Sequence, residues 1–219
     1  MKLLLVDDHA LFRGGLRLLL GAMQRDLAIL EADSCQAAAD LLEQHDDIKL
    51  CLVDLLLKDC KGDGVRENGM EVIRTIKDMR PEICTVVVSS DENPRRMHEA
   101  LEAGAMGYVL KSESPETMVQ ALQQVLGGGI YLPPAFMNQD KPAHNAPKLE
   151  LTERQQQVMD CLLLGWPNKL IVRKLGISEN TLKGHLAAIY RALNVSSRTM
   201  AVVEAGRRGW KVGQSEAQA

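Results

Sequence analysis

The sequence predicts an α/β domain built on a doubly wound, five-stranded parallel sheet, followed by a small all-α domain. In the first part of the chain, short apolar runs alternate with segments of helical periodicity, which is typical of successive βα units. Of the 219 residues, 46% are hydrophobic but only 3% are aromatic, and such an aliphatic composition suits helices packed on a parallel sheet. A stretch rich in glycine and proline separates the two parts at residues 127–148.

Secondary-structure signals recur in a regular order over residues 1–126. Apolar runs predict buried strands at residues 2–6, 27–31, 50–53, 85–88 and 108–110. Segments of helical periodicity predict helices at residues 11–23, 36–44, 70–79, 95–103 and 116–126. Ser34 and Ser114 stand where helix caps are expected, and Gly104 and Gly127 follow helix ends. Five βα units in succession predict a doubly wound, mainly parallel sheet.

The segment of residues 127–148 is the predicted boundary between two domains. It contains three consecutive glycines and four of the eight prolines of the chain. Ile130, Tyr131, Leu132 and Phe136 are apolar, so part of the segment is expected to pack on the first domain, and the remainder reads as a flexible tether. We therefore predict a first domain at residues 1–126 and a second at residues 149–213.

Charge is distributed unevenly along the chain. The net charge is −3, yet residues 149–213 carry ten basic against five acidic residues, a balance of +5 that leaves −8 for the rest. A basic second domain behind an acidic first domain is expected if only the second domain meets a polyanion.

The start of the chain does not read as a secretory leader. Its apolar run meets Asp7 and Asp8 too early, and no apolar stretch approaches the length of a membrane span. We therefore expect a cytoplasmic protein. None of its five cysteines belongs to a CxxC pair, so reduced thiols are expected and a zinc site is not.

Polar residues follow four of the five predicted strands. They are Asp7, Asp8, Asp54, Ser89, Ser90 and Lys111. Doubly wound sheets bind ligands beyond the carboxyl ends of their strands, so these side chains are expected to converge on one rim. Three carboxylates there would repel one another unless they shared a cation, and all-oxygen ligation favours Mg²⁺. The lysine supplies a point charge for phosphate oxygens, and a serine supplies a hydroxyl.

The first domain resembles the receiver domain of two-component response regulators. The motifs LLLVDDH, CLVDL, VVVSS and GYVLK carry the resemblance by their order and spacing over about residues 1–126. It implies a flavodoxin-like sheet in which Asp54 accepts a phosphoryl group from a histidine kinase. It also implies that Asp7, Asp8 and Asp54 hold the Mg²⁺ that makes this transfer feasible.

The resemblance implies roles for three further residues. Ser89 matches the switch hydroxyl of the family, Tyr108 its switch aromatic residue and Lys111 the lysine that pairs with the phosphate. Ser90 is the alternative for the hydroxyl, and Tyr108 could be a core residue only. Phosphate would add nearly two negative charges, which could draw Ser89 and Lys111 inward and reset the face formed by the fourth helix and fifth strand.

The segment after Asp54 departs from the family pattern. Lys58 occupies the position where the family usually has a proline. If Gly69 is the glycine that opens the third helix, it stands 15 residues after Asp54, distinctly farther than usual. The inserted DCKGDGVREN is rich in glycine and charge, which predicts a mobile flap beside the pocket. Such a flap could tune kinase recognition or phosphate lifetime, or it could be inert.

Helix signals return at the basic end of the chain. Thr152 and Gln155 form the pattern of a capping box at the start of a helix. Further helices are predicted at residues 168–175, 179–193 and 198–207, and the turn LGIS joins the first two of these. Two helices connected by so short a turn predict a helix-turn-helix.

This region resembles the LuxR-type DNA-binding domain over about residues 149–211. The blocks LTERQQQV, GWPNKLI, KLGISENTLKGHL, IYRALNV and SSRTMAV match the family in order. Together with the receiver motifs, they place the chain with response regulators of the NarL/FixJ type and imply double-stranded DNA as a partner. The implied recognition helix contains Asn180, Thr181, Lys183, Gly184, His185 and Ala187.

The implied contacts of this domain with DNA differ in kind. Asn180 and Thr181 stand near the helix N-terminus, where they could reach phosphates or base edges, and Lys183 could contact guanine. Lys169 and Arg191 are expected to contact phosphates.

Small residues on the recognition helix limit what it can read. Gly184 and Ala187 are short, so direct base readout is expected to be sparse and shape readout to count for more. His185 could be a structural residue of the helix.

The last helix matches the one through which the family pairs. Its pairing residues are expected to be Thr199, Val202 and Val203. A two-fold homodimer would read two half-sites.

We therefore expect a transcription regulator, not an enzyme. Its unphosphorylated receiver would restrain the recognition helix, and phosphorylation on Asp54 would free that helix or promote pairing on DNA. One alternative is a regulator that needs no phosphorylation, because the loop after Asp54 is atypical. An aspartate-nucleophile phosphatase is another, although no second acid/base residue is inserted near Asp54. A sensor of a small organic molecule is a third alternative, but an acidic rim suits Mg²⁺ better than an organic ligand.

Overall fold

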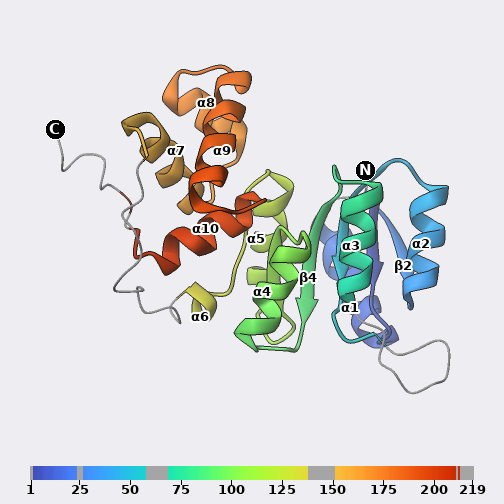
Figure 1. Ribbon diagram of the computed structural model, residues 1–219. Helices are drawn as coiled ribbons and strands as arrows, with labels where there is room; N and C mark the ends of the chain where they lie inside the picture. Colours follow the sequence, from blue (N-terminus) through green and yellow to red (C-terminus); the bar gives the residue numbers. More distant parts are fainter. Residues whose placement is uncertain (1, 24–26, 58–68, 138–150, 211, 213–219) are drawn as a thin grey trace. The chain divides into compact units, whose positions relative to one another are not determined.

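The computed structural model describes residues 2–23, 27–57, 69–137, 151–210 and 212 (Figure 1). The chain divides into two compact units, residues 1–126 and residues 127–219. The first unit is an α/β domain, and the second is all-α. Within the described ranges, no helix is both long enough and apolar enough to cross a membrane.

The first unit is built on one sheet of five parallel strands in the order β2-β1-β3-β4-β5 (Figure 1). The strands are β1 (Lys2–Val6), β2 (Ala28–Ala32), β3 (Ile48–Val53), β4 (Cys84–Ser89) and β5 (Gly107–Leu110). The predicted doubly wound fold is confirmed. The strand order reverses at β1, which lies between β2 and β3, and such a switch point opens a crevice beyond the carboxyl ends of neighbouring strands.

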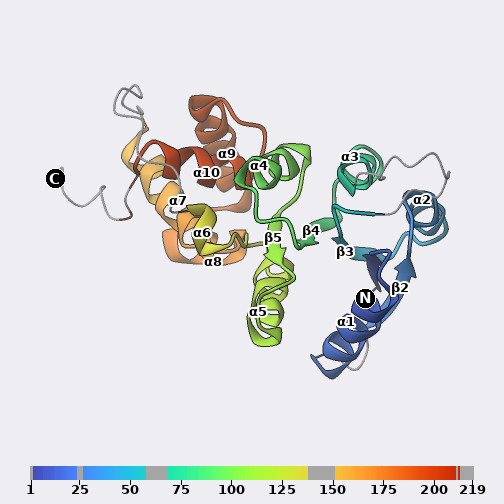
Figure 2. The same cartoon turned by 90° about the horizontal axis from the view of Figure 1, so that it is seen from below.

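Five helices of the first unit cover both faces of this sheet. They are α1 (Ala10–Met23), α2 (Cys35–Gln44), α3 (Gly69–Met79), α4 (Pro94–Ala103) and α5 (Pro115–Leu126). The helices α1 and α5 lie on one face, and α2, α3 and α4 lie on the other (Figure 2). The central strands are therefore buried from both sides, which explains why β1, β3 and β4 are almost uninterrupted aliphatic runs.

The element boundaries of the first unit lie within two residues of the predicted ones. Each of its five helices begins one residue earlier than predicted, because the capping residue directly precedes the first helical turn. The Ser34 hydroxyl accepts from the Ala37 N–H at 3.3 Å, and the Ser114 hydroxyl accepts from the Thr117 N–H at 3.2 Å. Pro94 and Pro115 occupy the first helical positions, where no N–H is needed.

Gly69 opens α3 against the backbone that follows β3. Its N–H donates to the Leu55 carbonyl oxygen at 3.2 Å. A Cβ at this position would overlap the carbonyl oxygen of Asp54, so only glycine permits this close approach. The structure thus bears out the assignment of Gly69 as the glycine that opens the third helix. Residues 58–68, the predicted flap, lie outside the described residues.

The described part of the second unit is built from helices. They are α6 (Pro134–Met137), α7 (Glu153–Leu163), α8 (Asn168–Leu175), α9 (Glu179–Leu193) and α10 (Arg198–Arg207). The predicted capping box is present at the start of α7, where Thr152 and Gln155 bond reciprocally. Gly176 ends α8 in a left-handed conformation with φ of 62°, which lets the chain turn at once into α9. The predicted helix-turn-helix is confirmed.

Ile130 departs from the predicted packing of the segment that follows the first unit. We expected this apolar stretch to pack on the first domain, but Ile130 joins the hydrophobic core of the second unit, together with Leu151 and Ile171. An apolar side chain predicts burial without indicating which of two cores receives it. Residues 138–150, most of the predicted tether, lie outside the described residues.

We predict that Gly69→Ala destabilises the protein by about 1–3 kcal/mol, because the added methyl group must displace backbone. Gly15→Ala is the matched control: a Cβ on Gly15 in α1 meets no atom within 4 Å. Alanine there is expected to stabilise the protein by about 0.5–1 kcal/mol. Urea unfolding measures both changes. A Gly69→Ala variant as stable as the wild type would contradict the constraint placed on the start of α3.

Candidate functional site

Asp7 and Asp54 stand side by side at the carboxyl ends of β1 and β3. The register pairs Val6 with Val53, so the residues that follow the two strands meet. The Asp54 N–H donates to the Val6 carbonyl oxygen at 2.8 Å, and the Asp7 N–H donates to the Ala32 carbonyl oxygen at 3.1 Å. The side chain of Asp54 is only 3% exposed and that of Asp7 only 1%. Backbone bonds of the sheet thus hold two carboxylates together in a buried position.

The ammonium group of Lys111 lies between these two carboxylates. Its Nζ is 2.7 Å from Asp54 Oδ2 and 2.7 Å from Asp7 Oδ2, and it lies 4.5 Å from the centre of the Phe12 ring. Burial disfavours the charged amine, but the hydrogen bonds and charges of Asp54 and Asp7 outweigh this effect and raise the pKa of Lys111 above its usual value. Lys111 therefore neutralises part of the acidic rim. No pattern in the sequence indicates the contact of Lys111 with Phe12.

Asp8 and His9 complete a group of four possible metal ligands with Asp7 and Asp54. One ligand atom from each residue lies within 4.8 Å of the others. Mg²⁺ binds oxygen at about 2.0–2.1 Å, so donors around one ion stand about 3–4 Å apart, and the three carboxylates supply the oxygen donors that it prefers. The structure brings together the three predicted aspartates. It adds His9, whose only signal was its place directly after the aspartate pair.

Ser89 and Ser90 differ in burial at the end of β4. Ser89 is completely buried, whereas Ser90 is exposed. The Ser89 hydroxyl accepts from the Asp91 N–H at 3.2 Å. This difference favours Ser89 over Ser90 as a hydroxyl directed into the protein, and its role as a switch stays a prediction.

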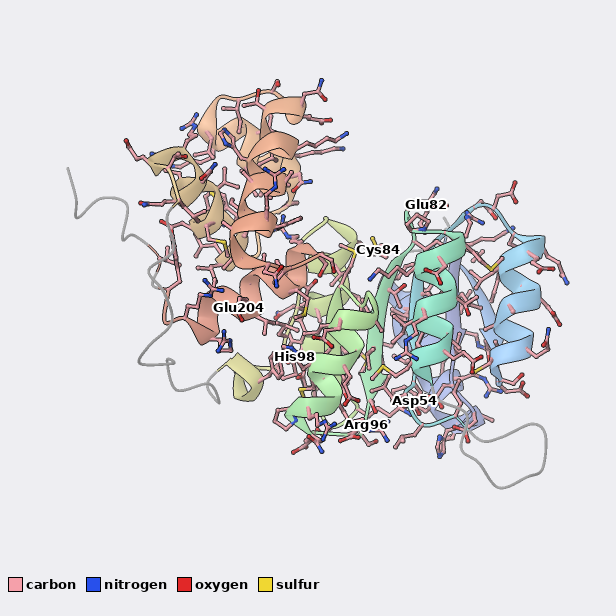
Figure 3. All side chains as sticks on the ribbon, in the orientation of Figure 1. Asp54, Glu82, Cys84, Arg96, His98 and Glu204 are labelled. Atoms are coloured by element: carbon pink, nitrogen blue, oxygen red, sulfur yellow. The ribbon has the colours of Figure 1, made fainter. Side chains whose placement is uncertain are left out.

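Tyr108 of β5 is completely buried and is bonded to the segment between β4 and α4. Its hydroxyl donates to the Asp91 carbonyl oxygen at 2.7 Å. The Asp91 carboxylate lies 3.6 Å from the guanidinium of Arg96, a residue of α4 that is labelled in Figure 3. Burial raises the pKa of Tyr108 to about 12, so the phenol stays neutral. Burial fits a core residue, while the hydrogen bond also couples β5 to this segment.

The predicted recognition residues lie on the outward side of α9. The inward side is formed by Leu182, Leu186, Ile189 and Leu193. The exposed residues are Asn180, Thr181, Lys183, Gly184, Ala187 and Arg191, while His185 is half-buried. A Cβ on Gly184 would meet no atom within 4 Å, so this part of the surface is open. The Thr181 hydroxyl lies 2.8 Å from the hydroxyl of Ser178, the N-cap of α9, which engages part of its hydrogen-bonding capacity.

The helix α8 adds positive charge to this unit. Lys169 is exposed on its first turn, as a predicted phosphate contact. Arg173 and Lys174 are exposed on its last turn, and sequence reasoning did not select them. They line a hollow of about 430 Å³ with Trp166 and Leu170. Their sequence signal is the basic pair in the last turn of a helix, which contributes to the positive charge of the second domain.

The helix α10 is held by contacts within the second unit. The Arg198 guanidinium donates to Asn168 Oδ1 at 3.1 Å and to the Trp166 carbonyl oxygen. Val202 belongs to the hydrophobic core of this unit, which gives it a structural role within one chain. Pairing of two chains through Thr199, Val202 and Val203 remains a prediction.

We predict that Lys111→Met lowers the free energy of unfolding by about 3–5 kcal/mol at neutral pH without divalent ions, because two buried carboxylates lose their cation. Lys2→Met is the control, since Lys2 pairs at 2.9 Å with the exposed Asp47 and solvent screens that pair, so its loss should change stability far less. Urea unfolding gives both values. Equal effects of the two substitutions would contradict the role of Lys111 as the cation of the rim.

Comparisons with known proteins agree with this geometry. The family profile of the response regulator receiver domain matches residues 3–123, and that of the bacterial regulatory proteins of the luxR family matches residues 149–205. The chain is similar to the glycerol metabolism activator of Pseudomonas putida, with 33% identity over 94% of this chain and 95% of that protein. It is similar to the nitrate/nitrite response regulator protein NarL of Escherichia coli strain K12, with 29% identity over 92% of this chain and 93% of NarL.

A solved structure supports the same assignment. The LuxR-family two-component response regulator from Aurantimonas sp. SI85-9A1 superposes with a TM-score of 0.54 and 29% identity, over 62% of this chain and 91% of that one. The chain therefore belongs to the response regulators that join a receiver domain to a LuxR-type DNA-binding domain.

Proposed function

We propose that Asp54 of this DNA-binding transcriptional response regulator accepts a phosphoryl group from a histidine kinase, and that the phosphorylated protein binds its DNA sites more tightly. The observation that carries the proposal is the Asp54 carboxylate at the switch point of the sheet, 2.7 Å from Lys111 Nζ. The other oxygen, Asp54 Oδ1, accepts from the Leu56 N–H at 3.2 Å, which orients the carboxylate. A buried, oriented carboxylate beside a fixed cation suits a nucleophile for an anionic group.

The proposed transfer needs one bond to form and one to break. A carboxylate oxygen of Asp54 attacks the phosphorus atom of a phosphohistidine, the P–N bond breaks and its electron pair leaves with the imidazole. An acyl phosphate then remains on Asp54. When bound by Asp7, Asp8 and Asp54, Mg²⁺ supplies positive charge that offsets the charge of the phosphoryl oxygens. Lys111, already at the same rim, pairs with one of these oxygens.

The new charge disturbs bonds that the structure shows around the pocket. The acyl phosphate carries about two negative charges where the free carboxylate carried one, and its oxygens compete with Asp7 for Lys111. It also offers an acceptor to the Ser89 hydroxyl, which now accepts from the Asp91 N–H. Since Tyr108 bonds to the Asp91 carbonyl oxygen, a shift of this segment reaches β5. We propose that this rearrangement releases the DNA-binding domain or promotes its pairing as a homodimer.

A second reading keeps DNA binding but removes the phosphate switch. It is favoured by the long segment between Asp54 and Gly69, which departs from the family pattern. Treatment with acetyl phosphate and Mg²⁺, followed by mass measurement of the intact protein, separates the two readings. A chain that gains no phosphoryl group under these conditions, or from a histidine kinase, would support regulation without phosphorylation.

We predict that Asp54→Asn abolishes both the gain of a phosphoryl group and the tightening of DNA binding that follows it, because an amide cannot form the acyl phosphate. Asp78→Asn is the control, since Asp78 is an exposed residue near the C-terminal end of α3, the end remote from the pocket. Intact mass and fluorescence anisotropy on operator DNA are the two measurements. A full response of Asp54→Asn to the donor would place the switch elsewhere.

We propose that the second domain reads DNA with few direct base contacts. Lys183 is the long basic side chain in the first two turns of α9, whereas Gly184 and Ala187 present little beyond backbone and a methyl group. Affinity would then come mainly from phosphate contacts of Lys169 and Arg191, and sequence preference from Lys183 and from DNA shape.

We predict that Lys183→Ala weakens binding to specific sites preferentially, by about 1–3 kcal/mol, because a base contact is lost. Lys169→Ala is expected to weaken binding to all sequences alike and to reduce the magnitude of the salt slope by about one. Titrations at several salt concentrations, on operator and on random DNA, measure both effects. Equal losses on both DNAs for both variants would refute this division of contacts.

A further inference from the structure

We infer that His9 is a fourth ligand of the divalent ion in the acidic pocket, and that it makes the pocket bind Mn²⁺ and other metals that accept imidazole more tightly than Mg²⁺. The inference rests on the proposed metal site and deepens it. The observation that supports the inference is the position of His9 Nδ1, which lies 2.9 Å from Asp8 Oδ1 and 3.4 Å from Asp7 Oδ1. The imidazole nitrogen therefore lies within ion-pair distance of two of the three carboxylates proposed to hold the ion.

The spacing of the four residues fits one ion. Ligand bonds of about 2.0–2.2 Å place neighbouring donors about 3 Å apart and opposite donors about 4.3 Å apart. The ligand atoms of Asp7, Asp8, His9 and Asp54 all lie within 4.8 Å of one another. This limit exceeds the separation of opposite donors by about 0.5 Å, so the side chains must move by a comparable distance for all four to reach one ion.

The backbone holds His9 in this position. Its N–H donates to Asp7 Oδ1 at 2.8 Å, directly before α1 begins. The imidazole side chain is 56% exposed, so Nε2 can keep its proton and bond to water while Nδ1 serves as the donor. A neutral imidazole with one nitrogen on the metal and the other hydrogen-bonded is the usual form of a histidine ligand.

Lys111 does not compete with His9 for the same oxygen atoms. Lys111 Nζ bonds to Oδ2 of Asp7 and Oδ2 of Asp54, whereas His9 faces Oδ1 of Asp7 and Oδ1 of Asp8. An ion on the His9 side can thus use Asp7 Oδ1 without removing the lysine from Asp7 Oδ2. The pocket therefore has two positions for positive charge. The Lys111 ammonium occupies one, and the carboxylate oxygens with the His9 nitrogen form the other.

The donor set decides which metals gain from His9. Mg²⁺ is a hard cation that prefers oxygen and retains water, so an imidazole adds little to its binding. Mn²⁺, Fe²⁺ and Zn²⁺ accept imidazole, and affinity rises along that series of transition metals. Loss of the imidazole is expected to weaken Mn²⁺ binding about tenfold or more and to leave Mg²⁺ binding nearly unchanged.

The test uses the full-length protein loaded with Mn²⁺ and the substitution His9→Gln, which keeps a polar side chain of similar reach. The control is His98→Gln, because His98 lies on α4, outside the group of four, and pairs with Glu102 at 3.4 Å (Figure 3). Pulsed electron paramagnetic resonance detects a nitrogen bonded directly to Mn²⁺. Titration calorimetry with Mn²⁺ and with Mg²⁺ gives the affinity of each variant.

We expect a nitrogen coupling in the wild type and in His98→Gln and none in His9→Gln, with the Mn²⁺ affinity of His9→Gln reduced and its Mg²⁺ affinity retained. Bound Mn²⁺ without nitrogen coupling in the wild type would overturn the role of His9 and leave the three-carboxylate site intact. Equal loss of both metals in His9→Gln would show a structural role only. Failure of the wild type to bind either metal would overturn this inference and also the metal component of the proposed function.

Discussion

The bond of one lysine to two buried aspartates is the interaction on which the first unit depends. Lys111 follows β5, whereas Asp7 and Asp54 follow β1 and β3, and β4 separates β3 from β5 in the sheet. The ammonium therefore reaches both carboxylates only when all of these strands are paired in register. Without that cation, two adjacent charges would remain in a nearly dry site, at a cost far above that of any surface ion pair.

The same arrangement makes the pocket responsive to charge. Lys111 is shared between Asp7 and Asp54, so any group that alters one carboxylate changes the balance at the other. Hydrogen bonds connect the pocket to the segment after β4, where the Asp91 N–H donates to the Ser89 hydroxyl and the Asp91 carbonyl oxygen accepts from the Tyr108 hydroxyl. Local electrostatics and a packed core are thus linked by a few defined bonds, as a switch requires.

In the second unit, the core residues of α9 and its proposed recognition residues lie on different sides of the helix. Leu182, Ile189 and Leu193 of α9 belong to a hydrophobic core that α7, α8 and α10 also supply, so the helix is held from one side. Its other side is free of large side chains at Gly184 and Ala187. A rigid helix with a sparse surface, next to the exposed basic residues of α8, favours binding that relies on phosphates and DNA shape.

By itself, the sequence determined the order of strands and helices along the chain, the polar residues that follow the strands and the glycine at position 69. Periodicity and backbone geometry are local properties, so they can be recognised without the fold. Parallel strands bring their carboxyl ends to one edge, so Asp7, Asp54 and Lys111 could be grouped without coordinates. The tertiary structure alone decided that Lys111 bonds to both aspartates, that His9 enters the metal group and that Ile130 packs in the second core. These features depend on register and side-chain direction between residues distant in sequence, which no local pattern encodes.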